Sequence, residues 1–210
     1  MRAEATRAVS TFTSSIVQDA RGIPPTTSFL AYSDLSAFAD APRVPVPEAQ
    51  TIVFVGSLEV YKNIDGLAAA WRRLVRELPD AHLFVVGKGS RRHVVEALVN
   101  DLPGRVTHDL ELPPPEVAAR MDAARALVLP SYPEGLGRVV LEAFARGRGV
   151  VATDAGGIPD MVDDGVQGLL FPPGDTDALV AALRRLLIDH ALAERLGEAA
   201  LETYAAWHQT

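Results

Sequence analysis

Two glutamates flank a glycine-rich turn within the stretch PEGLGRVVLEAFARG, residues 133–147. Glu134 and Glu142 stand eight positions apart, with Gly135 and Gly137 directly after the first acid and an apolar run of helical character around the second. Glycine lets a backbone approach a ligand closely, and the free amides at a helix start attract phosphate. A carboxylate accepts hydrogen bonds from sugar hydroxyls but repels phosphate. The pattern therefore predicts a mixed ligand, with hydroxyl-rich parts at the two acids and phosphate between them at the amides.

Simpler structural roles would explain the same charged residues. Glu134 would be favourable near any helix N-terminus, and Glu142 could pair with Arg138 one turn back for roughly a few tenths of a kcal/mol. Lys62, in the loop GSLEVYKN, could be an ordinary surface lysine or could neutralise a phosphate. Helical side chains tilt toward the helix N-terminus, so Glu142, about two turns into its helix, would lean back toward Glu134. The surrounding elements must decide between these interpretations.

Six short apolar runs, most of them with β-branched residues, predict strands. They are nearly continuous in apolar character, which is typical of parallel strands covered by helices on both faces. The runs are residues 51–56, 81–87, 104–109, 125–130, 149–154 and 168–171.

Helical patterns alternate with these runs. We expect a helix over Lys62 to Leu78 and a helix-like stretch over residues 13–22. Four more helices are expected: one capped by Ser90, one that begins at Pro115, one capped by Asp175 or Thr176, and a last one that begins at Asp189. The alternation predicts an α/β fold with an open, doubly wound parallel sheet of about six strands. Ligands of such sheets bind at the carboxyl ends of the strands, where GSLEVYKN, GKGS, HDLELPPP, SYPEGLG and TDAGGIPD lie. The last of these loops is predicted to turn at its glycines before a short helix begun by Pro159.

Composition excludes several classes of protein. The chain has 210 residues and a formal charge of −7, with scattered basic residues, so nucleic acid is not expected as a partner. It contains no cysteine, and its five histidines show no metal-ligand spacing, so we expect no metal site. No apolar run approaches the roughly 18–20 residues of a membrane span, and the N-terminus does not have the pattern of a signal peptide.

The first fifty residues differ from the rest. The stretch ADAPRVPVPEAQ, residues 39–50, is rich in proline and alanine and is interpreted as a linker. We place a domain boundary near Pro45 to Gln50, with residues 1–45 as the remnant of an N-terminal domain plus the linker, and residues 46–210 as a ligand-binding domain.

The loops, in this order, resemble the C-terminal, donor-binding half of the retaining family-four glycosyltransferases of the GT-B fold. The resemblance runs from TIVFVGSLEVYKN, at residue 51, to the end of the chain, and is densest in SYPEGLGRVVLEAFARGRGVVATDAGGIPDMVDDGVQGLLFPPGD. Two acids separated by seven residues are the signature of that family. The resemblance implies a Rossmann-like domain, one half of a two-domain architecture, that binds a nucleotide-diphosphate sugar without a metal or another cofactor.

The resemblance also implies roles for the matching residues. Glu142 would hold the ribose hydroxyls, Glu134 would contact the transferred sugar, and Lys62 would bind the diphosphate and stabilise the leaving group. Glu134 and Lys62 are therefore the catalytic candidates. The other donor-binding candidates are Gly56, Ser57, Gly135, Leu136, Gly137 and Arg138, together with His108 and Asp109 in a loop expected near the base.

The sequence departs from the family pattern at three places. Relatives usually have an arginine where this chain has Ser57, so one of two phosphate-binding cations is missing. Arg138 stands where relatives more often carry a small or apolar residue. The connection between domains, often PNGVD in relatives, is LAYSD here, Leu30 to Asp34.

The resemblance implies transfer of a hexosyl or other glycosyl group in glycan biosynthesis, with retention of configuration, to an unknown sugar, lipid or small-molecule acceptor. Because the acceptor domain is absent, we expect the chain alone to be inactive. Two alternatives stay open: a non-catalytic nucleotide-sugar-binding module that docks onto a partner chain, and a GT-B-like epimerase or phosphorylase. A cytoplasmic location is expected, and peripheral association with the inner face of the membrane would involve the missing half.

Overall fold

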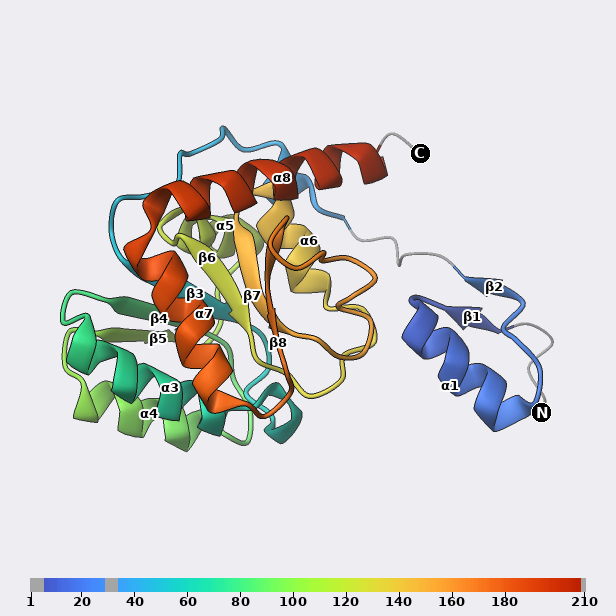
Figure 1. Cartoon of the computed structure of the whole chain (residues 1–210), viewed down its shortest axis with the longest axis horizontal. Coiled ribbons are helices and arrows are strands. Elements are labelled where there is room, and N and C mark those ends of the chain that lie inside the picture. The colour runs from blue at the N-terminus through green and yellow to red at the C-terminus, as the bar shows by residue number, and fades with distance from the viewer. Residues whose placement is uncertain (1–5, 29–33, 209–210) are drawn as a thin grey trace.

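The protein is described from a computed structural model, which covers residues 6–28 and 34–208. Its main body is built on one sheet of six parallel strands in the order β5-β4-β3-β6-β7-β8 (Figure 1). The strands are β3 Thr51–Val55, β4 His82–Val86, β5 Val106–Asp109, β6 Ala126–Leu129, β7 Gly149–Thr153 and β8 Gly168–Phe171. Each predicted run contains one of these strands, so the predicted parallel sheet is confirmed.

The central strands are apolar without alternation because both of their faces are covered. All residues of β6 and β7 are buried. Val53 of β3 pairs in register with Phe84 of β4 on one side and with Leu127 of β6 on the other. A strand with one wet face would need polar residues at every second position, which explains why continuous apolar runs predicted this sheet correctly.

The order of the strands reverses between β3 and β6. From β3 the chain moves outward through β4 and β5, returns to β6 on the other side of β3, and then moves outward through β7 and β8. In open α/β sheets the ligand lies at such a switch point, outside the carboxyl ends of the strands. The loops GSLEVYKN and SYPEGLG start at this point.

Helices cover both faces of the sheet. One apolar core contains residues of α3 (Ile64–Glu77), α4 (Arg92–Asp101) and α7 (Thr176–Ile188); the other contains residues of α2 (Ser36–Ala39), α5 (Pro114–Asp122) and α6 (Arg138–Ala145). The last helix, α8 (His190–His208), supplies Leu196 to the first core and Ala200 to the second. Figure 1 shows α8 along one end of the sheet. The doubly wound arrangement is therefore confirmed.

Helix starts agree with the sequence in part. Asp175 caps α7 by accepting from the Ala178 amide at 2.9 Å, and Asp189 accepts from the Leu192 amide at 2.9 Å before α8, as predicted. α5 begins at Pro114, one residue before the predicted Pro115.

Three other predicted starts were wrong. The helix expected from Lys62 begins at Ile64, because Asn63 adopts a left-handed conformation (φ 53°) and caps it. Lys62 instead ends a one-turn 3-10 helix, Val60–Lys62. Ser90 caps no helix; its hydroxyl donates to Glu59 at 2.6 Å. Residues 157–161 form turns, so the short helix expected at Pro159 is absent.

The N-terminal segment forms a small unit beside the main body (Figure 1). Two short parallel strands, β1 Arg7–Ala8 and β2 Thr27–Ser28, flank α1, Thr11–Arg21, which matches the predicted helix-like stretch. α1 begins with a capping box between Ser10 and Thr13. Most of the LAYSD stretch lies outside the described residues.

The predicted linker is held along its length by three buried arginines. Residues 38–49, which we call the strap, offer their backbone carbonyls in sequence to Arg146, Arg148 and Arg125. Arg146 donates to the carbonyls of Phe38, Ala41 and Pro42 at 2.7–3.0 Å, Arg148 to those of Val44 and Pro45 at 3.0–3.1 Å, and Arg125 to those of Pro47, Glu48 and Ala49.

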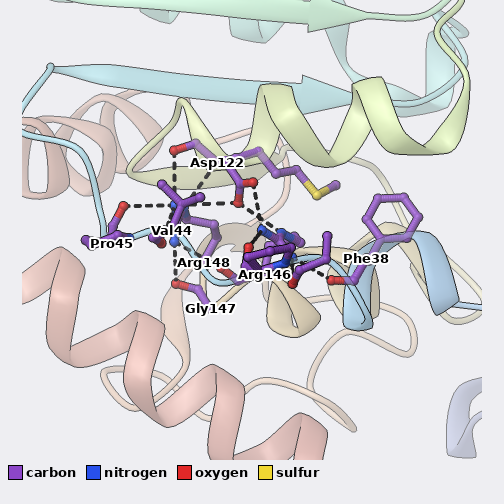
Figure 2. A network of polar contacts seen from close by, with 10 residues as sticks. Phe38, Val44, Pro45, Asp122, Arg146, Gly147 and Arg148 are labelled. Carbon is purple, nitrogen blue, oxygen red and sulfur yellow. Dashed lines mark hydrogen bonds and ion pairs between the residues drawn. The ribbon is translucent and has the colours of Figure 1, made fainter.

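Asp122 compensates the charge of this cluster. It accepts from Arg146 at 2.9 and 2.7 Å in a two-pronged contact, and one of its carboxylate oxygens lies 3.8 Å from Arg148 (Figure 2). Arg146 and Arg148 are each only 2% exposed. The cluster lies where β6 and β7 begin, at the end of the sheet opposite the switch-point loops.

No helix among the described residues is long and apolar enough to cross a membrane. Among the same residues, no group of three or more His, Asp or Glu is arranged to hold a metal ion.

Candidate functional site

Loops at the switch point bring two predicted site residues together. Lys62, in the loop after β3, forms an ion pair with Glu134, in the loop after β6. Their side chains are only 9 and 11% exposed, and the Tyr61 ring centre lies 5.2 Å from the Lys62 ammonium nitrogen. Among the described residues, Glu134 is the only carboxylate paired with Lys62. An ammonium group has three N–H donors, so Lys62 keeps donor capacity for an anionic ligand.

Two hydroxyl groups orient Glu134, one by a direct hydrogen bond and the other through the backbone of Ser131. The Ser131 hydroxyl donates to the Glu134 carboxylate at 2.8 Å, and the Thr153 hydroxyl donates to the Ser131 carbonyl at 2.6 Å. Ser131 is fully buried. The carboxylate is thus fixed by residues from the ends of both β6 and β7.

The backbone of Glu134 rests on the glycines of TDAGGIPD. Gly156 has φ 67°, and a side chain there would place its Cβ 2.3 Å from the Glu134 carbonyl oxygen. The Gly157 amide donates to that same carbonyl at 2.8 Å. The two glycines are therefore required by close contact between two loops, a more specific role than the chain reversal that their sequence alone suggests.

The glycine turn leads directly into α6. Gly137 precedes the helix with φ 63°, where a Cβ would lie 2.7 Å from the Ile158 side chain. The amides of Gly135, Leu136 and Gly137 donate to no other described residue. Free amides at a helix start carry partial positive charge and suit an anion.

Glu142 lies one turn into α6, nearer to the glycine turn than the predicted two turns, because the helix begins only at Arg138. Its carboxylate pairs with Arg138 at 3.2 Å, the local contact that the spacing allowed. The Glu142 side chain is 13% exposed, whereas that of Arg138 is 57% exposed. Burial raises the pKa of Glu142, and the charge of Arg138 acts in the opposite direction. Glu142 is thus a shielded carboxylate beside the turn.

A cavity of about 380 Å³ opens beside the pair, at the carboxyl ends of β3, β4 and β5. Its walls are mainly apolar, with a Lys88–Glu111 ion pair of 2.7 Å between two exposed side chains. Ser57 also lines the cavity, and its hydroxyl lies 3.3 Å from that of Tyr61. The cavity is lined by Val55, Gly56, Ser57, Val86, Gly87, Lys88, Leu110, Glu111, Leu112 and Val117.

The last two predicted residues have partners within the protein. His108 lies with Nε2 2.9 Å from the Gly87 carbonyl, and Asp109 accepts from Arg120 at 2.8 Å. Among the described residues, neither lines the cavity, whereas Leu110 to Leu112 of the same loop do. Residues 110–112 of the loop expected near a base therefore line this cavity, whereas His108 and Asp109 do not.

Sequence reasoning missed the supporting residues of the site. Ser131 and Thr153 are polar residues at the carboxyl ends of two buried strands, and this position was the available signal. Tyr61 and Tyr132 were missed as well; they are 47 and 40% exposed, and the Tyr132 amide donates to the Tyr61 carbonyl at 2.7 Å.

Known proteins are similar to this chain over most of its length. The model of the family "Glycosyl transferases group 1" matches residues 39–203. Sulfoquinovosyl transferase SQD2 of Arabidopsis thaliana is 36% identical over 159 residues, which are 74% of this chain and 30% of that protein. The chain spans less than half the length of the curated relatives it matches.

Solved structures have the same fold. Anabaena HepE, in complex with UDP and glucose, matches 97% of this chain and 59% of its own, with a TM-score of 0.82 at 22% identity. The C-terminal domain of the Francisella tularensis group 1 protein LpcC matches 84% of this chain and 93% of its own, with a TM-score of 0.67 at 21% identity. The Rossmann-like half of a GT-B architecture is thus confirmed, and the chain belongs to the glycosyl transferases group 1 family as a domain of the C-terminal type.

Proposed function

We propose that this domain binds the nucleotide-diphosphate sugar of a retaining, metal-independent glycosyltransferase, and that transfer requires an acceptor domain in addition. The observation that carries the proposal is the Lys62–Glu134 pair at the switch point, beside the free amides of the glycine turn. Lys62 and the amides supply positive charge for a diphosphate. HepE, which has the same fold, was solved with UDP and glucose, in line with such a donor.

The donor's orientation follows from the charges. The base would enter the apolar cavity beside Ser57, and the diphosphate would lie between Lys62 and the amides. Glu142 would accept the ribose hydroxyls, and Glu134 would accept hydroxyls of the transferred sugar. As the bond to the sugar breaks, negative charge grows on the diphosphate, and Lys62 would stabilise it.

Binding calorimetry tests the assignment. The probes are UDP-glucose, ADP-glucose and GDP-mannose. We expect Lys62→Ala and Glu142→Ala each to weaken binding of the preferred donor by about 1–3 kcal/mol, because each removes a charge-assisted hydrogen bond. Arg73→Ala is the matched control, since that cation pairs with Asp177 on the exposed surface. Unchanged affinity in both folded site variants would contradict the proposal.

A second measurement tests the requirement for the acceptor domain. The chain is incubated with labelled donors, and products are separated by charge and mass. We expect no transfer by the chain alone. Robust transfer would contradict the division of labour, and conversion of the donor into an epimer or a sugar phosphate would favour a GT-B-like epimerase or phosphorylase.

A further inference from the structure

The first turn of α1 contacts a residue that the proposed function does not use. Asp160, in the loop after β7, accepts from the Thr11 amide at 2.7 Å and from the Thr11 hydroxyl at 2.6 Å. Thr11 is the first residue of α1, so Asp160 binds one of the amides that a helix start leaves free. A carboxylate there also opposes the positive end of the helix dipole. The contact joins the N-terminal unit to the main body.

The same contact lies against the loops of the site. A Cβ on Gly157 would lie 2.8 Å from the Ser10 Cβ and 2.2 Å from the Gly135 carbonyl oxygen. A Cβ on Gly135 would lie 3.3 Å from the methyl group of Thr13. Gly157 is thus enclosed between the start of α1 and the glycine turn. In Figure 1 the first turn of α1 faces the main body at the side of this loop.

We infer that Asp160 is a positioning residue of the donor site. Its contact with Thr11, which we call the clasp, holds the start of α1 in place. Residues 10–13 then lie along one side of the glycine turn, and we call them the wall. The inference rests on the proposed function. It places that wall at the sugar end of the donor, beside Glu134 and Gly135, and away from the cavity proposed for the base. The clasp therefore supports binding of the sugar more than binding of the nucleotide.

The position of α1 is the first readout. The chain contains no cysteine, so Gln18→Cys and Glu202→Cys, at exposed positions, introduce unique sites for spin labels. We expect one narrow label-to-label distance in the parent and a broad distribution in Asp160→Ala. Thr11→Val keeps the amide donor and should broaden the distribution of label-to-label distances less than Asp160→Ala does. Asp163→Ala removes an exposed carboxylate of the same loop without a side-chain contact to α1, and should leave it narrow.

Affinity is the second readout and separates positioning from general loss of structure. Each donor of the panel is compared with its free nucleoside diphosphate. We expect Asp160→Ala to weaken sugar-donor binding by about tenfold and diphosphate binding by less than about twofold, since two hydrogen bonds to a charged group are lost at the sugar end alone. Asp163→Ala should change neither affinity.

The two readouts fail in distinguishable ways. An unchanged label distance in Asp160→Ala, or an equal loss of affinity for donor and diphosphate, would overturn the role of Asp160 while leaving the proposed function intact. Absence of donor binding by the parent chain would overturn the proposed function, and the label distances would still decide whether Asp160 holds α1.

Discussion

The two ends of the central sheet hold their charged side chains in opposite ways. At the end where strands begin, Arg146 and Arg148 are buried and donate to backbone carbonyls and to Asp122 (Figure 2). At the end where strands finish, Lys62 pairs with Glu134 and keeps unused donors, while the nearby amides of the glycine turn have no partner among the described residues.

This difference separates charges that are fully used within the fold from charges that keep capacity for a ligand. A buried cation whose donors all find acceptors within the protein has nothing left to offer a ligand, and its removal leaves those acceptors unsatisfied. A cation held by one carboxylate is positioned but can still bind an anion. The following predictions test this contrast, from the largest expected effect to the smallest.

Removal of a buried arginine should give the largest loss of stability. Arg148→Met removes donors to the carbonyls of Met121, Asp122, Val44 and Pro45. We expect the free energy of unfolding to fall by about 3–5 kcal/mol, as when a partner is removed from a buried charged network. Urea denaturation measures the change, with Arg73→Met at the surface as a control expected to lose less than about 0.5 kcal/mol. Similar losses of unfolding free energy in the two variants would contradict the stabilising role of the buried arginine.

At the other end of the sheet, we expect the Lys62–Glu134 pair to matter less for the fold than the buried arginines do, and to matter for the proposed ligand as well. Lys62→Met and Glu134→Gln each leave a poorly exposed partner alone, so we expect each to destabilise by about 1–3 kcal/mol. The double variant leaves no orphan charge and should lose less than the sum of the two, yet should bind donor no better than Lys62→Met. A double-mutant cycle measures the stability changes by urea denaturation, and calorimetry measures donor binding. Strictly additive losses of stability would contradict the ion pair.

The pH dependence of Glu142 should have a definite sign. Burial raises its pKa in the folded state, so the folded protein prefers the protonated form, and the stability that this preference gives is lost as pH rises through the raised pKa. Glu142→Gln removes this loss. We expect the variant to be more stable than the parent at about pH 7, with the difference vanishing below the ordinary carboxyl range. Thermal melts across pH measure the stability difference between variant and parent. A difference that stays constant with pH would contradict the raised pKa of Glu142.

The smallest effect is expected at Arg138. This side chain is more than half exposed and pairs with Glu142 one turn away, so Arg138→Ala should change the free energy of unfolding by less than about 0.5 kcal/mol. Loss of the nearby positive charge should nevertheless raise the pKa of Glu142 further, which carbon-13 NMR of its carboxyl group can follow. A lowered pKa in the variant would contradict the assigned pairing.

The sequence predicted the sheet well because its signal is local. Short apolar runs marked each of the six strands. Asp175 and Asp189 marked helix starts, since a capping side chain acts on residues close to it in the chain. Ser90 shows the limit. Its hydroxyl bonds to Glu59, which lies 31 positions earlier, and no local pattern reports that competition.

For the candidate site, the glycine-rich loops at strand ends predicted which loops to compare, but not how the structure supports them. The meeting of Lys62 with Glu134 depends on strand order, which fixes β3 beside β6. The strap went unrecognised for a different reason. Its acceptors are backbone carbonyls, which every residue carries, so residues 38–49 look like a flexible proline-rich linker in sequence.

The strap also determines an order of events during synthesis. Phe38 leaves the ribosome long before Arg146, which lies 108 positions later, and the partners of Val44 and Pro45 follow at a similar distance. Contacts this far apart in sequence form late because closing the intervening chain costs entropy. Until Arg146 and Arg148 have been made, the carbonyls of Phe38, Val44 and Pro45 lack these donors. The path of the connection to the N-terminal unit is therefore set by arginines between α6 and β7, which are synthesised long after the connection itself.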